Sequence, residues 1–273
     1  MLSINTDYAR DEGAARPYLR AIAEAGFSHI HWVHRWRGDY LYARSEMEEI
    51  GRWFREYGLQ LNDLHATEGW EKFWLAPEKY RRQAGLELVQ NRIDLTHHLG
   101  GDAIALHLWA NPEDDPPPEF ISWLREALDA LLPYARERGV RIAFENLYPA
   151  NYNTLRRVLA EYSPAEVGIC YDSGHGNIAG GGAEFLDSVK DRLLVLHLND
   201  NDGVSDLHQT LFYATVDWPP LAEIIAASAY DKPLSMELSI KNMDVKQEAA
   251  FLAKAMETGR RFAEMVKRSE IRD

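Results

Sequence analysis

The 273-residue sequence has a single cysteine, Cys170, which excludes a disulfide within the chain. No apolar run approaches the roughly 20 residues that a membrane-spanning helix needs. The opening residues, MLSINTDYARDEG, have neither the basic and apolar regions of a signal peptide nor the composition of a transit peptide. These absences predict a cytoplasmic protein that does not span a membrane.

Basic residues are also scarce relative to acidic ones. Lysine and arginine total 30, against 43 aspartates and glutamates, which gives a formal net charge of −13. A polyanion would on average meet a repulsive surface, so this balance argues against a nucleic-acid partner. No lysine or arginine occurs between residues 193 and 231.

The remaining composition is that of a compact globular protein, because 46% of the residues are hydrophobic, 27% are charged and no low-complexity tract occurs. The length suits either one large domain or two smaller ones. Since no linker or shift in composition divides the chain, we expect a single domain over residues 1–273.

Short runs rich in apolar residues recur along the chain, each typical of a strand buried on both faces. They lie at residues 2–5, 27–34, 59–66, 102–108, 140–147, 167–174, 193–200 and 233–239. Segments with helical periodicity lie between them, as at 16–26, 45–58, 78–100, 118–139 and 152–162. Most of these segments end in glycine or a turn, as a helix C-terminus favours.

This alternation predicts parallel strands joined by crossover helices, and eight repeats in about 250 residues is the size of a (β/α)8 TIM barrel. A doubly wound open sheet is the competing α/β architecture. It is disfavoured because no glycine-rich dinucleotide loop follows the first predicted strand. We therefore expect a TIM barrel.

Polar side chains follow strand after strand, at the end where barrel enzymes place their reacting groups. They are His65, His107, Glu145, Asn146, Asp172, His175, His197, Asn199, Asp200 and Glu237, and the loop after the seventh strand adds Asp206 and His208. A histidine taken alone is explained as well by structural hydrogen bonding as by ligation. The glutamates in IAFENL and LSMEL differ, because a carboxylate inside an apolar strand needs a counter-charge or hydrogen-bond donors.

In a closed barrel, Glu145, Asp172, His197 and Glu237 converge on one mouth. Three carboxylates and one imidazole suit a divalent cation such as Mn²⁺, Mg²⁺, Co²⁺ or Zn²⁺. We expect one such ion at this place, with coordination positions left open for a substrate.

With these residues in view, the chain resembles the xylose-isomerase-like sugar isomerases and epimerases, whose barrel is shared with endonuclease IV. The resemblance covers essentially the whole chain and depends on the order and spacing of several short motifs. They are FENL, CYDSGH, LHLNDNDG followed by DLH, VDW and SMEL.

The resemblance implies that Glu145, Asp172, His197 and Glu237 bind one divalent cation. It also implies that Glu145 and Glu237 are catalytic and exchange protons with substrate carbons through an enediolate that the metal stabilises. His175, Asp206 and His208 match positions that bind substrate in the family, and His65 and His107 are further candidates. Family resemblance suggests a small carbohydrate-like substrate and a homodimer or homotetramer.

Eight tryptophans are present, and several lie near the predicted mouth. Trp32, Trp36 and Trp109 are candidate walls for the apolar C–H faces of a sugar, although they serve equally well as packing residues. His34 and Arg35, in HWVHRWRGDY, are candidate donors to a substrate.

Two departures from the family pattern bear on the substrate. The stretch QTLFYATVDW contains neither proline nor glycine before Asp217, and the cationic gap at 193–231 covers a region where several ketose epimerases carry an arginine. We therefore expect an unphosphorylated polyol-type substrate.

Two other activities remain open at this point. A dehydratase or lyase would use the same proton abstraction and then expel a β-hydroxyl group. An endonuclease acting on abasic DNA would use His65, His107, Glu145, Asp172, His175, His197, Asp206, His208 and Glu237, which together resemble the trinuclear zinc ligands of that family. The acidic composition disfavours the nuclease.

Overall fold

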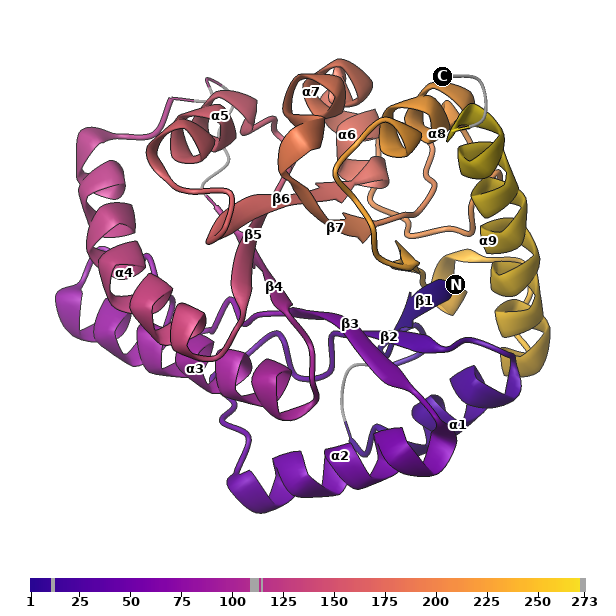
Figure 1. The fold of residues 1–273 in the computed structure, drawn as a ribbon, viewed down its shortest axis with the longest axis horizontal. Coiled ribbons are helices and arrows are strands. Elements are labelled where there is room, and N and C mark those ends of the chain that lie inside the picture. Colours follow the sequence, from indigo (N-terminus) through magenta and orange to yellow (C-terminus); the bar gives the residue numbers. More distant parts are fainter. Residues whose placement is uncertain (11–12, 109–112, 114, 271–273) are drawn as a thin grey trace.

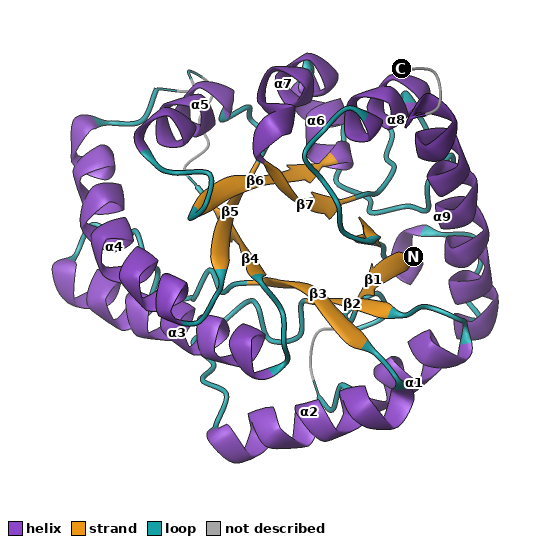
Figure 2. Ribbon diagram, viewed as in Figure 1, coloured by secondary structure: helices purple, strands orange, loops and turns teal. Residues whose placement is uncertain are grey.

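The computed structural model describes residues 1–10, 13–108, 113 and 115–270. Its strands form one parallel sheet in the order β7-β6-β5-β4-β3-β2-β1-β8, which curls into a barrel (Figures 1 and 2). The strands are β1 (Leu2–Asn5), β2 (His29–Trp32), β3 (Gln60–His65), β4 (Ala103–His107), β5 (Arg141–Glu145), β6 (Val167–Asp172), β7 (Leu193–His197) and β8 (Leu234–Met236). The barrel closes just beyond β7, where the N–H of Leu198 donates to the carbonyl of Ser235 and the N–H of Glu237 donates to the carbonyl of Leu198.

Helices surround this barrel, as the alternating pattern of the sequence predicts (Figure 2). They are α1 (Arg16–Glu24), α2 (Arg44–Tyr57), α3 (Lys79–His98), α4 (Pro118–Glu137), α5 (Tyr152–Glu161), α6 (Ser173–Ala179), α7 (Gly182–Val189), α8 (Trp218–Ala226) and α9 (Glu248–Glu270), with short 3-10 turns at Lys190–Arg192 and Ile240–Asn242. Gly58 ends α2 with a left-handed φ of 67°, a conformation that glycine adopts without steric cost. The predicted (β/α)8 TIM barrel is confirmed.

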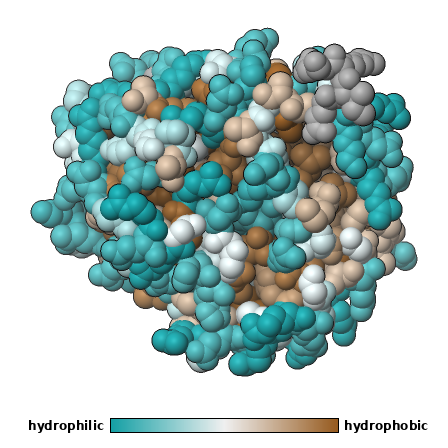
Figure 3. Space-filling view, in the orientation of Figure 1, coloured by the Kyte–Doolittle hydropathy of each residue, from teal (hydrophilic) through white to brown (hydrophobic). Residues whose placement is uncertain are grey.

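The helices turn their apolar sides toward the sheet. Hydrophilic residues dominate the rim of the face in Figure 3, and hydrophobic residues are visible nearer its centre.

No helix among residues 1–10, 13–108, 113 and 115–270 is long and apolar enough to cross a membrane.

Alternation along each strand divides the buried residues into two sets. Ile104, Leu106, Ile142 and Phe144 belong to the large core between sheet and helices. A separate cluster of mostly small residues occupies the barrel interior, namely Ala103, Ala105, Ala143, Cys170, Leu194 and Val195. The interior positions that follow this cluster, at the carboxyl ends of β4 to β7, are His107, Glu145, Asp172 and His197.

The opposite end of the barrel carries a different polar group. Asp102, just before β4, accepts hydrogen bonds from Lys232 Nζ at 2.6 Å and from Arg141 Nη2 at 3.0 Å. Burial would raise the pKa of this carboxyl, but Lys232 and Arg141 lower it below its usual value. Asp102 therefore provides a paired carboxylate at the amino ends of the strands, away from the predicted site.

Candidate metal centre

A cavity of 630 Å³ opens at the carboxyl ends of the strands. Eight of the predicted site residues line it: Trp36, His65, His107, Glu145, His175, Asp206, His208 and Glu237. Asp172 and His197 lie fully buried beside them. The structure thus brings together the polar residues that the sequence placed at separate strand ends.

Glu145, Asp172, His197 and Glu237, which we call the primary cluster, offer ligand atoms that all lie within 4.8 Å of one another. His197 Nδ1 is 3.3 Å from Glu145 Oε2 and 3.2 Å from Glu237 Oε2. Within the described residues, neither His197 Nδ1 nor Glu145 Oε2 has a hydrogen-bond partner. Buried polar atoms without partners are costly, and a divalent cation bound by these oxygen and nitrogen atoms would satisfy them. The donor set therefore fits the predicted ion.

The two glutamates of the primary cluster are held ionised by their neighbours, whereas burial favours the protonated form of the aspartate. Burial would raise the pKa values of Glu145 and Glu237, but His197 and other nearby histidines lower both well below the usual range. Burial, only partly offset by His175, raises the pKa of Asp172 to about 6. Without a cation, positive charge on His197 and the nearby histidines balances the two glutamates, and a bound divalent cation would take over that role.

Hydrogen bonds from neighbouring segments fix both the side chain and the backbone of Asp172. Its Oδ1 accepts the backbone N–H of His175 at 2.6 Å, which caps the first turn of α6, and its Oδ2 accepts Asn199 Nδ2 at 2.7 Å. Asn146 bonds to both backbone groups of Asp172, at 2.8 and 2.9 Å. These bonds orient the carboxylate before any ligand arrives.

Substitution of Gly174 should disturb this arrangement. A Cβ atom at Gly174 would overlap Asn199 Oδ1 and lie 2.7 Å from Asn201 Nδ2. Because Asn199 holds Asp172, we expect Gly174→Ala to lower the free energy of unfolding by about 1–3 kcal/mol and to weaken metal binding. Denaturant unfolding and calorimetric metal titration would measure the two effects.

Gly51→Ala is the control, because the nearest atom to its Cβ, at 3.3 Å, belongs to the side chain of His98. A Gly174→Ala protein equal to the wild type in stability and metal affinity would contradict this account.

His65, His107 and Glu145 form a second group of convergent ligand atoms. His65 Nδ1 faces the carbonyl of Ala66 at 2.9 Å and His107 Nδ1 faces Glu68 Oε1 at 2.6 Å, so each Nδ1 is the donor. In the neutral rings, both Nε2 atoms then carry lone pairs, although they lie 3.2 Å apart and 3.4–3.5 Å from Glu145 Oε2. Such a geometry needs a proton or a cation between the acceptors. The pKa of His107 is raised to about 9, because Glu145 and Glu68 outweigh the lowering effect of burial.

His175, Asp206 and His208 form a third group. His175 lies in the first turn of α6. Asp206 Oδ1 is 3.0 Å from His208 Nε2, and Asp206 Oδ2 is 3.6 Å from His175 Nε2. Burial would lower the pKa of His208, but Asp206 and Glu237 raise it to about 9.

The loop that carries Asp206 and His208 begins at Asp200, and the side chain of Asp200 holds the far end of the loop. This buried carboxylate accepts the N–H groups of Ala214 and Val216 at 3.0 Å each. It also accepts the indole N–H of Trp218, at the start of α8, at 3.3 Å. The far end of the bulky stretch QTLFYATVDW is therefore anchored to the barrel rim, where the N–H of Thr215 also donates to the carbonyl of Asn201 at 3.1 Å.

The predicted substrate contacts of Trp32 and His34 are not supported. His31 faces the barrel interior, so alternation turns Trp32 outward, where it is 1% exposed and donates to the Tyr42 hydroxyl at 3.0 Å. The ring of His34 is buried near Tyr18 and Trp32 and is not among the described residues lining the cavity. Trp109 lies outside the described residues.

Several cavity residues were not predicted from the sequence, including Asn5, Asp7, Arg37, Glu68, Tyr148 and Lys241. Arg37, and not Arg35, is the arginine from HWVHRWRGDY that lines the cavity. His31 and Asp63 were also missed. They are fully buried in the barrel beside His197, and the alternating pattern of HIHW was the available signal for His31.

The chain is similar in sequence to a curated protein and in fold to solved structures of sugar epimerases. The chain is 34% identical over 283 residues to an uncharacterised protein, y4fM, of Sinorhizobium fredii, covering 94% of this chain and 90% of that protein. It resembles the solved structure of a D-tagatose 3-epimerase-like protein with a TM-score of 0.79, 19% identity and 98% coverage of both chains. It also resembles D-allulose 3-epimerase from Methylomonas sp., with a TM-score of 0.78, 17% identity and coverage of 95% and 96%.

The family model described as xylose isomerase-like TIM barrel matches residues 19–255. This match spans most of the chain, including the four residues of the primary cluster. The chain therefore belongs to the xylose isomerase-like TIM barrel family.

Proposed function

We propose that this protein is a divalent-metal-dependent isomerase or epimerase of a small carbohydrate-like substrate. The observation that carries the proposal is the placement of Glu145 and Glu237, which come from β5 and the end of β8, line one cavity and flank His197 Nδ1. Epimerisation next to a carbonyl needs a proton removed from one face and a proton returned to the other. The sugar epimerases among the structural neighbours support this proposal.

The primary cluster would hold the cation through Glu145, Asp172, His197 and Glu237. When bound, the cation would supply a Lewis acid that neutralises negative charge developing on the substrate oxygens. Their neighbours hold the pKa values of Glu145 and Glu237 well below the usual range, so both are present as the carboxylate form that proton abstraction requires. The other glutamate must first gain a proton before it can return one, and their roles exchange with the substrate face.

The cavity walls indicate the class of substrate. Trp36 and Tyr148 line the cavity and offer aromatic surface to apolar C–H faces. Five carboxylates line it, from Asp7, Glu68, Glu145, Asp206 and Glu237, against one arginine and one lysine, Arg37 and Lys241, beside the histidines described above. An excess of carboxylates disfavours a phosphate group, so we propose an unphosphorylated polyhydroxylated substrate.

Proton exchange tests the proposal. The metal-loaded protein would be incubated with a panel of ketoses, inososes and keto acids in deuterated water, and each mixture followed by NMR. We expect one class to lose the signal of a carbon-bound proton next to its carbonyl. Loss of a β-hydroxyl group as well would indicate the dehydratase, and no exchange with any compound would contradict the proposal.

A multi-metal phosphodiesterase is the second candidate. It is favoured by the presence of two further ligand groups beside the primary cluster. They are His65, His107 and Glu145, which shares Glu145 with the primary cluster, and His175, Asp206 and His208. The acidic cavity and the net charge of −13 count against it, because a DNA substrate needs cationic contacts along its phosphates. Three tightly bound zinc ions per chain, together with cleavage of abasic DNA, would favour this candidate over the isomerase.

A further inference from the structure

His31 and Asp63 form a polar pair inside the barrel beside the primary cluster. They come from β2 and β3, are partners in the parallel register and are both fully buried. Their side chains form a hydrogen bond between His31 Nδ1 and Asp63 Oδ1. Neither residue lines the cavity that we assign to substrate, so the proposed reaction does not use them directly.

A local irregularity in the sheet gives Asp63 its direction. Ile30 pairs with Leu61 and His31 pairs with Asp63, so Asn62 is an extra residue in β3. Asn62 donates from Nδ2 to Asp63 Oδ2 at 2.8 Å. Bulges of this kind redirect side chains next to functional sites.

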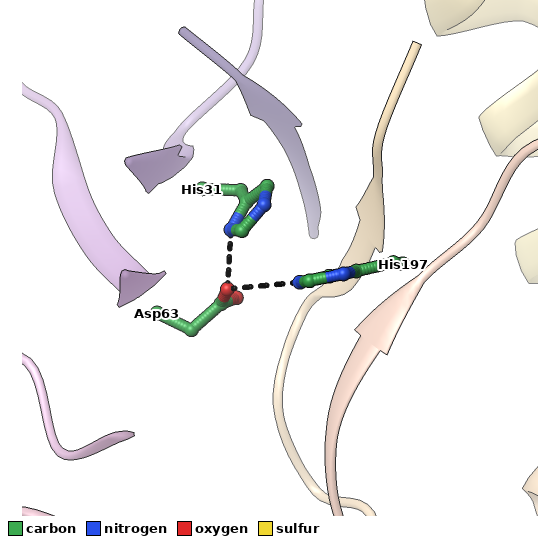
Figure 4. Close-up of side chains that lie close together, drawn as sticks. All are labelled: His31, Asp63 and His197. Carbon is green, nitrogen blue, oxygen red and sulfur yellow. Dashed lines mark hydrogen bonds and ion pairs between the residues drawn. The ribbon is translucent and has the colours of Figure 1, made fainter. Parts of the chain in front are cut away.

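Asp63 also faces a metal ligand of the primary cluster. Figure 4 shows its carboxylate between the rings of His31 and His197. Asp63 Oδ1 is 3.7 Å from His197 Nε2, longer than a hydrogen bond but on the side of the ring opposite Nδ1. Hydrogen bonds in unliganded active sites are often long and tighten when the ligands bind.

His31 extends the contact to a second ligand. Its Nε2 lies 3.8 Å from Glu237 Oε1, and its ring centroid is 4.2 Å from that of His197. His31 and Asp63 thus contact two of the four residues in the primary cluster from the side away from the cavity.

Packing alone does not explain the pair. The neighbouring interior residues include Ala103, Ala105, Ala143 and Val195, which fill the barrel without buried charge. Taking a carboxylate out of water costs several kcal/mol unless partners compensate it, whereas apolar residues of similar volume avoid that cost. A charged pair at this depth therefore indicates a task that apolar residues cannot perform.

We propose that His31 and Asp63 are positioning residues for the metal centre. Asp63 accepts the Nε2 proton of His197, which leaves the lone pair of Nδ1 directed at the cation, and His31 fixes the orientation of Glu237. This inference rests on the metal centre of the proposed function, but not on the substrate or the reaction. Carboxylates that orient metal-binding histidines in this way strengthen metal affinity.

The test compares metal affinity in variants that remove the pair. His31→Leu combined with Asp63→Ala nearly conserves the total side-chain volume and leaves no unpaired buried charge, so we expect it to fold. Calorimetric titration with Co²⁺ should give a dissociation constant raised by about 10–100-fold, with a changed Co²⁺ absorption spectrum. Asp63→Asn should weaken binding in the same direction. Asp102→Asn, the same change at the opposite end of the barrel, should bind Co²⁺ like the wild type.

The tautomer of His197 gives a readout that needs neither metal nor activity. In the metal-free protein, at a pH high enough for His197 to be a neutral imidazole, ¹⁵N NMR of the imidazoles should find the His197 proton on Nε2, and Asp63→Asn should shift this population toward Nδ1. A folded double variant with wild-type Co²⁺ affinity and spectrum would overturn the inference. If the double variant does not fold, an Asp63→Asn protein with unchanged affinity and unchanged tautomer would overturn it. A wild-type protein that binds Co²⁺ but exchanges no substrate proton would contradict only the proposed function.

Discussion

Glutamine in place of Glu145 should lower the rate of substrate proton exchange by about 10³-fold or more. Glutamine keeps the size of the side chain but cannot accept a proton at neutral pH, and it removes one negative charge from the primary cluster. Glu145 is 1% exposed and belongs to more than one of the ligand groups, so no other carboxylate can take its position. The rate would be measured by NMR in deuterated water at saturating metal.

The matched control is Glu161→Gln, which changes the same functional group in a surface ion pair with Arg125. Its exchange rate should equal that of the wild type. An unchanged exchange rate in the Glu145→Gln protein would remove Glu145 from the reaction and leave Glu237 as the remaining candidate base.

Removal of divalent cations by a chelator should lower the Tm by roughly 10 °C. A ligand present at about 1,000 times its Kd stabilises the folded state by about 4 kcal/mol. Each kcal/mol shifts the Tm of a chain of 150–250 residues by about 2–4 °C. Scanning calorimetry with and without added Mn²⁺ would measure the difference, and metal analysis should find about one cation per chain.

The metal-free protein should also lose stability as the pH rises from about 6.5 to about 9. His107 and His208 have folded-state pKa values of about 9, above the value of 6.5 for free histidine. A raised histidine pKa contributes stability that is fully present below pH 6.5 and is lost as pH rises through the folded value. The same calorimetric scans at several pH values would detect the trend. A Tm that responds neither to chelator nor to this pH range would contradict the metal centre.

The part of the site that could be predicted from the sequence follows from one regularity. Parallel strands in a barrel end at the same rim, so any polar residue that follows an apolar strand is carried to the site. Glu145 in IAFENL and Asp172 in VGICYD were found in this way, and the structure places their carboxylates in one cluster.

Other positions depend on which face of the strand a residue takes, and there the sequence was less informative. Trp32 was expected at the mouth, but His31 occupies the interior and Trp32 packs beneath the helices. Asp63 faces inward because Asn62 is an extra residue in β3, and a bulge leaves no clear signal in a single sequence. Arg37 reaches the cavity through a loop, where no periodicity guides prediction.

The attachment of the loop after β7 to Asp200 separates the part of the protein that lines the cavity from the part that holds the primary cluster. The Asp200 carboxylate, together with the bond from the N–H of Thr215 to the carbonyl of Asn201, secures the far end of the loop next to its start. The entropic cost of closing a loop rises only slowly with the number of residues in it. The intervening residues carry Asp206 and His208 to the cavity, while the primary cluster is held by the strands themselves. Insertions or exchanges within this loop can therefore change which molecule is accepted without a change in the barrel that holds the cation.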